Sequence, residues 1–393
     1  MTVKTINRPG SLDTGPPFRP NRAQEEPTSR SARPIPLPTV PPHGGDVYAA
    51  ARSLGTPVAD LLDFSANINP LGYPPCLRQA VFDSFDLIRH YPDPDCRELR
   101  QAIADYHGLS ASEVLVGNGS TELIYLLARA WRPDRALVVA PAFSEYERAL
   151  ETAGLAVDFF VTSESDGFLL KDPPELGADD LIFLANPGNP GGGLLGPERL
   201  RPILETWDRD GAKVVLDEAF VDFREEASMK ALVGRLPGLV VLRSFTKFFG
   251  MPGLRLGYLL AEAGLIRTLA RDSQPWSVNV LAQVAGRVCL DDPDYIARTR
   301  AAVDRERKAL AGALAGIDGI EVFPGAANYL LAKLTRTGWT AAELRRRMLR
   351  QGILIRDASN FRGLGETFFR VAVRSAEENR RLIESLSRCL SQG

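Results

Sequence analysis

Six short apolar runs alternate with charge-bearing, helix-compatible segments over residues 113–260, and this alternation is what most constrains the fold. The runs are EVLVGNG, ALVVAP, LIFLANP, AKVVLDEAF, LVVLRSF and RLGYLL. Strands that alternate with helices predict a mostly parallel sheet that is covered by helices on both faces. Ligands of such sheets bind beyond the carboxyl ends of the strands. We therefore predict an α/β protein with its site at that edge.

The chain as a whole divides into four parts. Residues 1–42 carry ten of the 29 prolines and no periodic pattern, which predicts a disordered proline-rich extension. Residues 43–85 are expected to form an N-terminal segment that packs with a small domain and the active site. Residues 86–286 are expected to form the large ligand-binding domain. After them, a long polar helix pattern, the runs NYLLAKL, ILIRDA and FFRVAVRS, and a final helix predict a smaller α+β domain over residues 287–393.

Composition narrows the classes of function. A chain of 393 residues with 45% hydrophobic residues, 24% charged residues and a net charge of −2 is typical of a globular protein without a nucleic-acid or membrane partner. Four cysteines without a CxxC pair and only three histidines argue against a metal site and against a disulfide framework. The sequence shows no basic start followed by an apolar run and no stretch of 18 apolar residues, so the expected location is the cytoplasm.

The stretch SFTKFFGMPGLRLGY, residues 244–258, places Lys247 in the connection between two apolar runs. Lysine is most often a solvated surface residue, but a buried amine between core strands needs a partner. A desolvated lysine near a cation such as Arg255 has a lowered pKa and acts as a nucleophile or forms a Schiff base. Ser244, Thr246 and Arg255 are residue types that bind phosphate. The stretch therefore predicts a ligand that has both a carbonyl and a phosphate.

Polar residues follow three other apolar runs. After EVLV, the segment GNGSTELIYLLARAW predicts a helix that begins near Ser120, and its free N–H groups either hold a phosphate or are capped in the ordinary way. Asn189, in NPGNPGG, is either a donor to a ring oxygen or part of a simple turn. Asp217 ends a buried run, where a carboxylate needs a protonated pyridine nitrogen or a core arginine. Together with the lysine, these features describe a site for pyridoxal 5′-phosphate.

The same motifs resemble a known family. From about His43 to the C-terminus, the chain is similar to fold-type-I pyridoxal-phosphate enzymes of the histidinol-phosphate aminotransferase branch. Within that branch, the segments that resemble the L-threonine-O-3-phosphate decarboxylases most are HGGDVYAAARSLG, LLDFSANINPLG, RHYPDPD, LRSFTKFFGMPGLRLGYLL, QPWSVN, ANYLL, ILIRDASNF and FFRVAVRS. The resemblance implies an aminotransferase class I/II-like large domain and a homodimer with shared active sites. It also implies decarboxylation of L-threonine O-3-phosphate to (R)-1-aminopropan-2-yl phosphate for cobalamin biosynthesis.

The resemblance further implies roles for individual residues. Lys247 matches the lysine that binds the cofactor covalently, Asp217 the partner of its pyridine nitrogen, and Asn189 the donor to its phenolic oxygen. The other positions that match cofactor-binding residues are Phe143, Ser120, Thr121, Ser244, Thr246, Arg255 and, reaching across from a second subunit, Tyr91. The positions that match substrate-binding residues are His43, Gly44, Asn67, Asn189, Arg356 and Arg370. Of these, Arg370 is expected at the substrate carboxylate, and Arg356 with the His43–Gly44 segment at its phosphate.

Two departures from the family pattern leave alternatives open. GNPGG replaces the usual NNPTG, and Phe220 replaces the tyrosine of DEAY, which removes one hydroxyl from the cofactor's phenolic oxygen. The alternatives are a histidinol-phosphate aminotransferase and a decarboxylase of serine phosphate, because one methyl group changes binding by only ~1–3 kcal/mol. A third alternative is a ligand-sensing regulator fused to a DNA-binding domain, but residues 1–42 are too short and unpatterned for such a domain.

Overall fold

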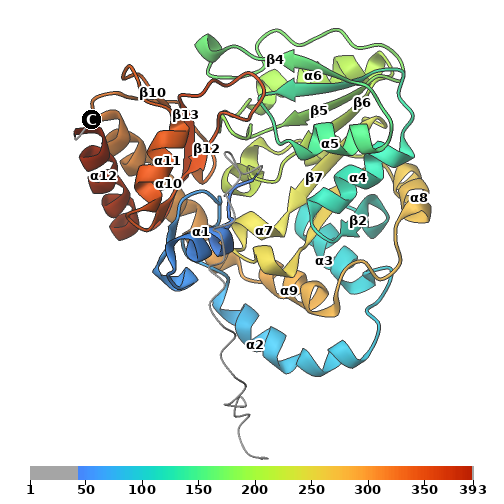
Figure 1. The fold of residues 1–393 in the computed structure, drawn as a ribbon. Helices are drawn as coiled ribbons and strands as arrows, with labels where there is room; N and C mark the ends of the chain where they lie inside the picture. The colour runs from blue at the N-terminus through green and yellow to red at the C-terminus, as the bar shows by residue number, and fades with distance from the viewer. Residues whose placement is uncertain (1–42, 392–393) are drawn as a thin grey trace, which may run out of the picture. The chain divides into compact units, whose positions relative to one another are not determined.

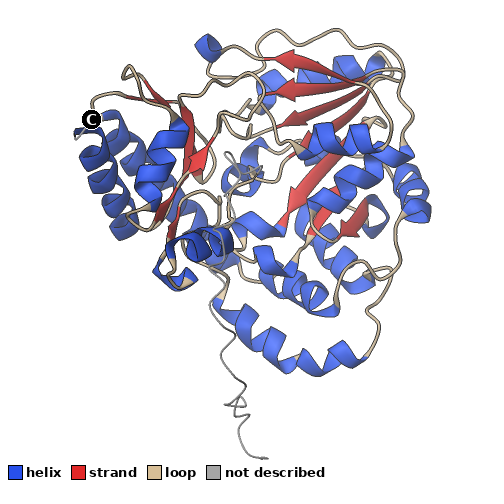
Figure 2. Ribbon diagram, in the orientation of Figure 1, coloured by secondary structure: helices blue, strands red, loops and turns tan. Residues whose placement is uncertain are grey.

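The computed structural model describes residues 43–391, so the extension predicted for residues 1–42 lies outside the described residues. Its largest sheet has seven strands in the order β2-β8-β7-β6-β5-β3-β4 (Figures 1 and 2). These strands are β2 (Val114–Gly117), β3 (Ala136–Ala140), β4 (Val157–Val161), β5 (Leu181–Ala185), β6 (Lys213–Asp217), β7 (Leu239–Ser244) and β8 (Gly257–Leu260). Five neighbouring strands pair in parallel, in the order β4-β3-β5-β6-β7. Strand β8 is antiparallel to both of its neighbours, β7 and β2. The predicted α/β class with a mostly parallel sheet is confirmed.

Each face of this sheet has its own hydrophobic core, because successive side chains of a strand point to opposite sides. In β6, Val214 and Leu216 belong to one core and Val215 to the other. The helices on the first face are α3 (Arg97–His107), α6 (Pro197–Arg209) and α9 (Val280–Leu290). The helices on the second face are α4 (Ser120–Ala130), α5 (Glu145–Thr152) and α8 (Ala263–Asp272). Burial on both faces explains why these strands read as continuous apolar runs.

A second sheet of four antiparallel strands, in the order β12-β13-β10-β9, forms from the C-terminal part of the chain. Its strands are β9 (Ile320–Val322), β10 (Tyr329–Leu334), β12 (Arg356–Asp357) and β13 (Phe368–Ala372). The helices that accompany it are α10 (Pro293–Ala315), α11 (Ala341–Leu349) and α12 (Ala376–Ser391). Figure 1 shows these elements in orange and red beside the larger sheet. None of the helices within residues 43–391 is long and apolar enough to cross a membrane.

The N-terminal segment of the described chain joins this C-terminal part. Strand β1 (Leu62–Asp63) pairs in parallel with β11 (Ile353–Leu354). Helix α1 (Val47–Leu54) precedes β1, and helix α2 (Pro75–Asp83) follows it and packs on α9. The run ILIRDA forms two short strands, β11 and β12, with Ile355 between them. The domain boundaries expected from the sequence stay a prediction.

Candidate active site

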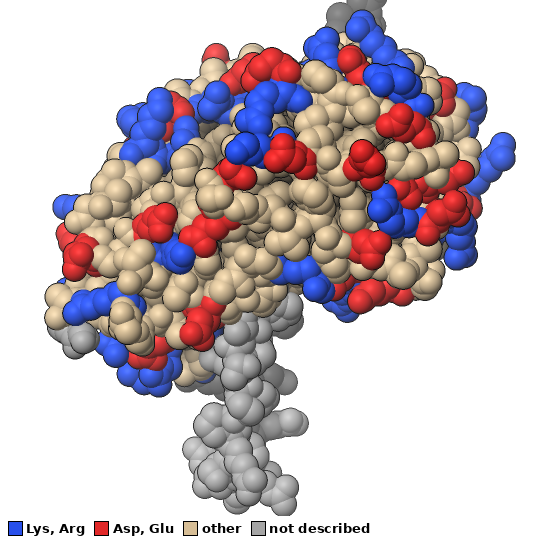
Figure 3. All heavy atoms as spheres, turned by 90° about the horizontal axis from the view of Figure 1, so that it is seen from above, with Lys and Arg blue, Asp and Glu red and all other residues tan. Residues whose placement is uncertain are grey.

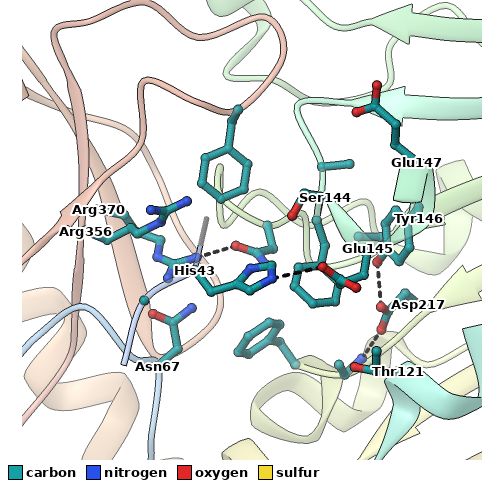
Figure 4. A pocket seen from close by; sticks show the side chains of 18 of the residues that line it. His43, Asn67, Thr121, Ser144, Glu145, Tyr146, Glu147, Asp217, Arg356 and Arg370 are labelled. Atoms are coloured by element: carbon teal, nitrogen blue, oxygen red, sulfur yellow. Dashed lines mark hydrogen bonds and ion pairs between the residues drawn. The ribbon is translucent and has the colours of Figure 1, made fainter. Parts of the chain in front are cut away.

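A cavity of about 730 Å³ lies at the carboxyl ends of the parallel strands, the edge at which the sequence predicts ligands. The last residues of β3, β5, β6 and β7 line it: Ala140, Ala185, Asp217 and Ser244. The opposite wall comes from the N-terminal segment and the four-stranded sheet, through residues such as Asn67, Arg356 and Arg370 (Figure 4). The cavity therefore lies between one wall of strand ends and one wall of side chains from distant parts of the chain.

Lys247 lies in a one-turn helix, α7 (Phe245–Phe248), directly after β7. The Ser244 hydroxyl caps this turn by accepting a hydrogen bond from the backbone N–H of Thr246. Burial, followed by the positive charges of Arg370 and Arg255, lowers the pKa of the Lys247 amine to about 8. The sequence named Arg255 as the neighbouring cation, and the structure adds Arg370. An amine with this pKa is partly neutral near pH 7–8 and is a competent nucleophile.

Asp217 is a buried carboxylate that is held by two hydrogen bonds. The Tyr146 hydroxyl donates to Oδ2 at 2.5 Å, and the backbone N–H of Ala219 donates to Oδ1 at 2.8 Å. Burial raises the pKa of Asp217, while the hydrogen bonds and the charge of Lys247 oppose this shift. No arginine of the described chain pairs with Asp217, since the core arginine, Arg243, forms ion pairs with other carboxylates. Asp217 is therefore poised for a cationic ligand group.

The N-terminus of α4 forms a cup with Arg255. The helix begins at Ser120 behind Gly119, and no side chain of residues 43–391 caps it. Gly119 has a φ of +79°, and a Cβ there would lie 2.6 Å from Nη2 of Arg255. A Cβ at Gly257 would lie 2.3 Å from the backbone nitrogen of Ser120. The free N–H groups, the guanidinium and the nearby Ser244 hydroxyl suit a phosphate, so the alternative of an ordinary Ser/Thr cap does not hold.

Two buried arginines face each other on the opposite wall. Arg356 of β12 and Arg370 of β13 are directly paired across neighbouring strands. Arg370 donates to Oδ1 of Asn189 at 2.5 Å and to the Ser65 carbonyl at 3.0 Å, and Arg356 donates to Oδ1 of Asn360 at 2.7 Å. Burial lowers the pKa of both guanidinium groups to about 10. Like charges directly opposite each other destabilise a sheet, so an anion in this cavity would relieve the repulsion.

The structure brings all but one of the sequence-predicted site residues to the cavity. The members that line it are His43, Gly44, Asn67, Ser120, Thr121, Phe143, Asn189, Asp217, Ser244, Thr246, Lys247, Arg255, Arg356 and Arg370. Tyr91 does not line it: the residue is 82% exposed, and its ring is tilted by 35° against that of Trp276, with 5.0 Å between the ring centroids. Oδ1 of Asn67 is buried without a hydrogen-bond partner among the described residues.

The cavity residues that sequence reasoning missed include Glu145 and Tyr146, and Tyr125 contacts the first of these through a hydrogen bond. Tyr146 and Glu145 lie in the first turn of α5, the helix that follows Phe143. The available signal was the segment PAFSEYERAL, a helix directly after the apolar run of β3. Tyr125 gave no signal, because it lies in the middle of α4 and meets Glu145 only in the folded chain.

Comparison with known proteins matches the fold and the site to one family. Residues 59–386 match the family model of aminotransferase class I and II. The chain belongs to this family. Its cofactor is pyridoxal 5′-phosphate, and the residues present fit that group: a buried amine, a buried carboxylate and a phosphate cup kept open by Gly119. The family and the cofactor expected from the sequence are confirmed.

Relatives within the family carry two activities. The chain is 42% identical to the threonine-phosphate decarboxylase of Salmonella typhimurium, over 89% of this chain and 96% of the relative. It is 36% identical to the histidinol-phosphate aminotransferase of Symbiobacterium thermophilum, over 91% of this chain and 97% of the relative. The crystal structure of L-threonine-O-3-phosphate decarboxylase from Porphyromonas gingivalis has a TM-score of 0.77 at 33% identity, covering 84% of this chain and 100% of that chain.

Proposed function

We propose that this family member decarboxylates L-threonine O-3-phosphate and releases (R)-1-aminopropan-2-yl phosphate, the product that the family resemblance assigns to cobalamin biosynthesis. The observation that carries the proposal is the facing pair Arg356 and Arg370 in the cavity. Two guanidinium groups on one wall suit a small ligand with two anionic ends, and guanidinium is the side-chain group that best matches both carboxylate and phosphate. The 42% identity to a threonine-phosphate decarboxylase supports the same substrate.

The wall of strand ends would hold the cofactor. Lys247 would bind its aldehyde carbon, Asp217 its ring nitrogen, Asn189 its phenolic oxygen, and Phe143 would stack on its ring. The residues that would hold its phosphate are Ser120, Thr121, Ser244, Thr246 and Arg255. When bound, pyridoxal 5′-phosphate accepts the electron pair that is released as a bond to the substrate Cα breaks. Asp217 favours this by keeping a proton on the ring nitrogen.

The opposite wall would decide which bond breaks. Arg370 would hold the substrate carboxylate, and Arg356 with the His43–Gly44 segment the substrate phosphate, each through charge-assisted hydrogen bonds of about 1.5–3 kcal/mol. Fixing both ends would prevent rotation about Cα and would thereby select which bond to Cα breaks. With Arg370 holding the carboxylate in the reactive orientation, that group would leave as carbon dioxide. The Lys247 amine, with its pKa of about 8, is the candidate to return a proton to Cα.

A histidinol-phosphate aminotransferase is the second candidate, because relatives with that activity reach 36% identity. A decarboxylase of serine phosphate is a close variant of the first. We would incubate the enzyme with threonine phosphate, serine phosphate, or histidinol phosphate plus 2-oxoglutarate, and analyse the products. Release of carbon dioxide from threonine phosphate without formation of glutamate would support the proposal. Faster release of carbon dioxide from serine phosphate would identify serine phosphate as the preferred substrate. Glutamate formed from histidinol phosphate and 2-oxoglutarate would refute decarboxylation.

We also infer that the enzyme is a homodimer in which each active site contains residues of both subunits. Its proposed location is the cytoplasm. Exposed apolar side chains lie at the end of α2 and in the segment after it, namely Phe82, Phe85, Ile88 and Tyr91, of which Phe82 is 76% exposed. A second copy is the proposed cover, with Tyr91 reaching the cofactor phosphate of that copy. Light scattering should give twice the chain mass, and Phe82→Glu with Ile88→Glu should give a monomer. A monomeric wild type would contradict the inference.

No nucleic acid is proposed as a partner. Figure 3 shows basic and acidic side chains interspersed over much of one face, in agreement with the net charge of −2. Binding to nucleic acid requires a concentrated basic surface. A DNA-binding assay at moderate salt should therefore give no complex, whereas a complex would favour the regulator alternative.

A further inference from the structure

Glu145 is a carboxylate in a cavity for which an anionic substrate is proposed. It lies in the first turn of α5, only 7% of its surface is exposed, and it lines the cavity. A negative charge at this place repels a substrate that carries a phosphate and a carboxylate. Glu145 must therefore make a favourable contribution to the site that outweighs its repulsion of the substrate.

Both oxygens of Glu145 have partners. Oε1 lies 2.9 Å from Nε2 of His43, and Oε2 accepts a hydrogen bond from the Tyr125 hydroxyl at 2.9 Å. The remaining charged neighbour is Arg148, which lies 3.8 Å from Oε1 and has a largely exposed side chain. The two short contacts fix the carboxylate between α4 and the N-terminal segment. In Figure 4, the His43 ring and Glu145 lie between the two arginines and Asp217.

The backbone that follows His43 is held separately, through Gly44 and Gly45. A Cβ at Gly44 would lie 2.1 Å from the Ser65 carbonyl oxygen, so only glycine allows this close approach. The backbone N–H of Gly45 donates to the Ser65 hydroxyl at 2.8 Å, and that hydroxyl donates to Asp63 at 2.6 Å. The backbone is therefore fixed on the side of β1, and the imidazole is fixed by a residue 102 positions away on α5.

We propose that Glu145 is a positioning residue that holds the His43 imidazole over the cavity so that His43 binds the substrate phosphate, and that Tyr125 orients Glu145. A carboxylate accepts hydrogen bonds, so this contact uses the N–H at Nε2, and in the doubly protonated ring the second N–H, at Nδ1, would donate to the substrate phosphate. The proposal rests on the proposed function, and it adds two residues to which the family resemblance gives no role. It also explains a buried carboxylate on the substrate side, because Glu145 acts through His43 and not on the substrate itself.

Glu147 offers a matched control in the same helix. It also lines the cavity, but its carboxylate pairs with Nη2 of Arg362 at 2.8 Å instead of with His43. Replacing either glutamate removes one negative charge from the same cavity. Simple electrostatics predicts tighter binding of a phosphorylated ligand in both variants. The proposal predicts weaker binding for the Glu145 variants alone.

The test is a double-mutant cycle between His43 and Glu145 in the holoenzyme. The probe is (R)-1-aminopropan-2-yl phosphate, which carries the phosphate, lacks the carboxylate and is not consumed, and 1-aminopropan-2-ol is the unphosphorylated control. We expect Glu145→Ala to weaken binding of the phosphorylated probe by about tenfold or more and Glu145→Gln by less, because glutamine still accepts a hydrogen bond. In the His43→Ala background, Glu145→Ala should no longer weaken binding and should tighten it slightly, because only the removal of a negative charge is left, whereas the effect of Glu147→Gln should add to that of His43→Ala. Kinetics on threonine phosphate should show a raised KM with kcat nearly unchanged.

Several results would overturn the inference. These are additive effects of His43→Ala and Glu145→Ala, tighter binding in Glu145→Ala, or equal losses for the probe and its unphosphorylated control. Tyr125→Phe, which removes a single hydroxyl, should weaken binding in the same direction and guards against a misfolded Glu145→Ala. If the wild type binds the probe but releases no carbon dioxide from threonine phosphate, the proposed function fails while the cycle still tests Glu145. If it decarboxylates and the cycle is additive, only the inference fails.

Discussion

The two walls of the cavity are built in different ways. The cofactor wall consists of residues at or shortly after the ends of strands of one sheet, such as Asp217 at the end of β6 and Lys247 shortly after β7. The substrate wall is assembled from Arg356, Arg370 and His43, whose positions depend on strand register and on long-range contacts. The difference agrees with the proposed function, in which the first wall supports chemistry common to the family and the second selects the substrate and the bond that breaks.

Of the changes to the cofactor wall, Lys247→Ala should have the largest effect on activity. We expect turnover to be abolished, because no amine remains to bind the cofactor covalently or to move a proton at Cα. Wild type should show a visible absorption band that borohydride bleaches, and the variant should lack it. A wild type that shows no such band after reconstitution would remove the basis of the comparison.

Asp217→Ala should lower turnover by several orders of magnitude with the fold intact, because the ring nitrogen loses the carboxylate that keeps it protonated. Steady-state kinetics measures the turnover, and circular dichroism shows whether the fold is intact. Tyr146→Phe removes one of the two hydrogen bonds to Asp217 and should cost about tenfold in kcat. Near-normal rates in Asp217→Ala would mean that the carboxylate serves only the fold.

The substrate wall is tested by separating its two arginines. Arg356→Ala should lose about a hundredfold in kcat/KM on threonine phosphate and change little on unphosphorylated threonine, because only the phosphate contact is removed. Arg370→Ala should weaken both substrates, since both carry the carboxylate. Equal proportional losses on the two substrates in Arg356→Ala would refute its phosphate role and favour a substrate without a phosphate.

The smallest effect concerns the pH dependence of cofactor binding. The pKa of Lys247 is lowered to about 8, so the neutral amine becomes the main form as the pH rises through that value. The rate at which the cofactor-free protein recombines with pyridoxal 5′-phosphate should rise about eightfold from about pH 7 to about pH 8.5. Absorbance measures the rate. A rate that stays flat over this range would mean that the amine titrates elsewhere.

Sequence reasoning predicted the cofactor wall better than the substrate wall, for a physical reason. Lys247, Asp217 and Ser120 each follow an apolar run, and a parallel sheet brings the ends of such runs to one edge. Strand β4 was not identified, because its segment VDFFV includes Asp158 and forms the edge of the sheet, where burial is incomplete.

The contacts within the substrate wall could not be predicted from the sequence. That Arg356 faces Arg370 follows from the register of β12 against β13, which two short strands do not specify in the sequence. The bond between His43 and Glu145 joins residues 102 positions apart, and neither residue has a pattern that points to the other. The family resemblance named His43 and Arg356 but not their partners.

The facing arginines also link ligand binding to the stability of the whole protein. Two buried guanidinium groups on adjacent strands repel each other, and a dianion between them replaces repulsion by attraction. An ion that binds there only in the folded state stabilises that state by mass action. The free energy of unfolding then rises with the logarithm of the ion concentration, once this concentration exceeds the dissociation constant. We therefore expect inorganic phosphate or sulfate that binds between these arginines to raise the thermal stability of the enzyme.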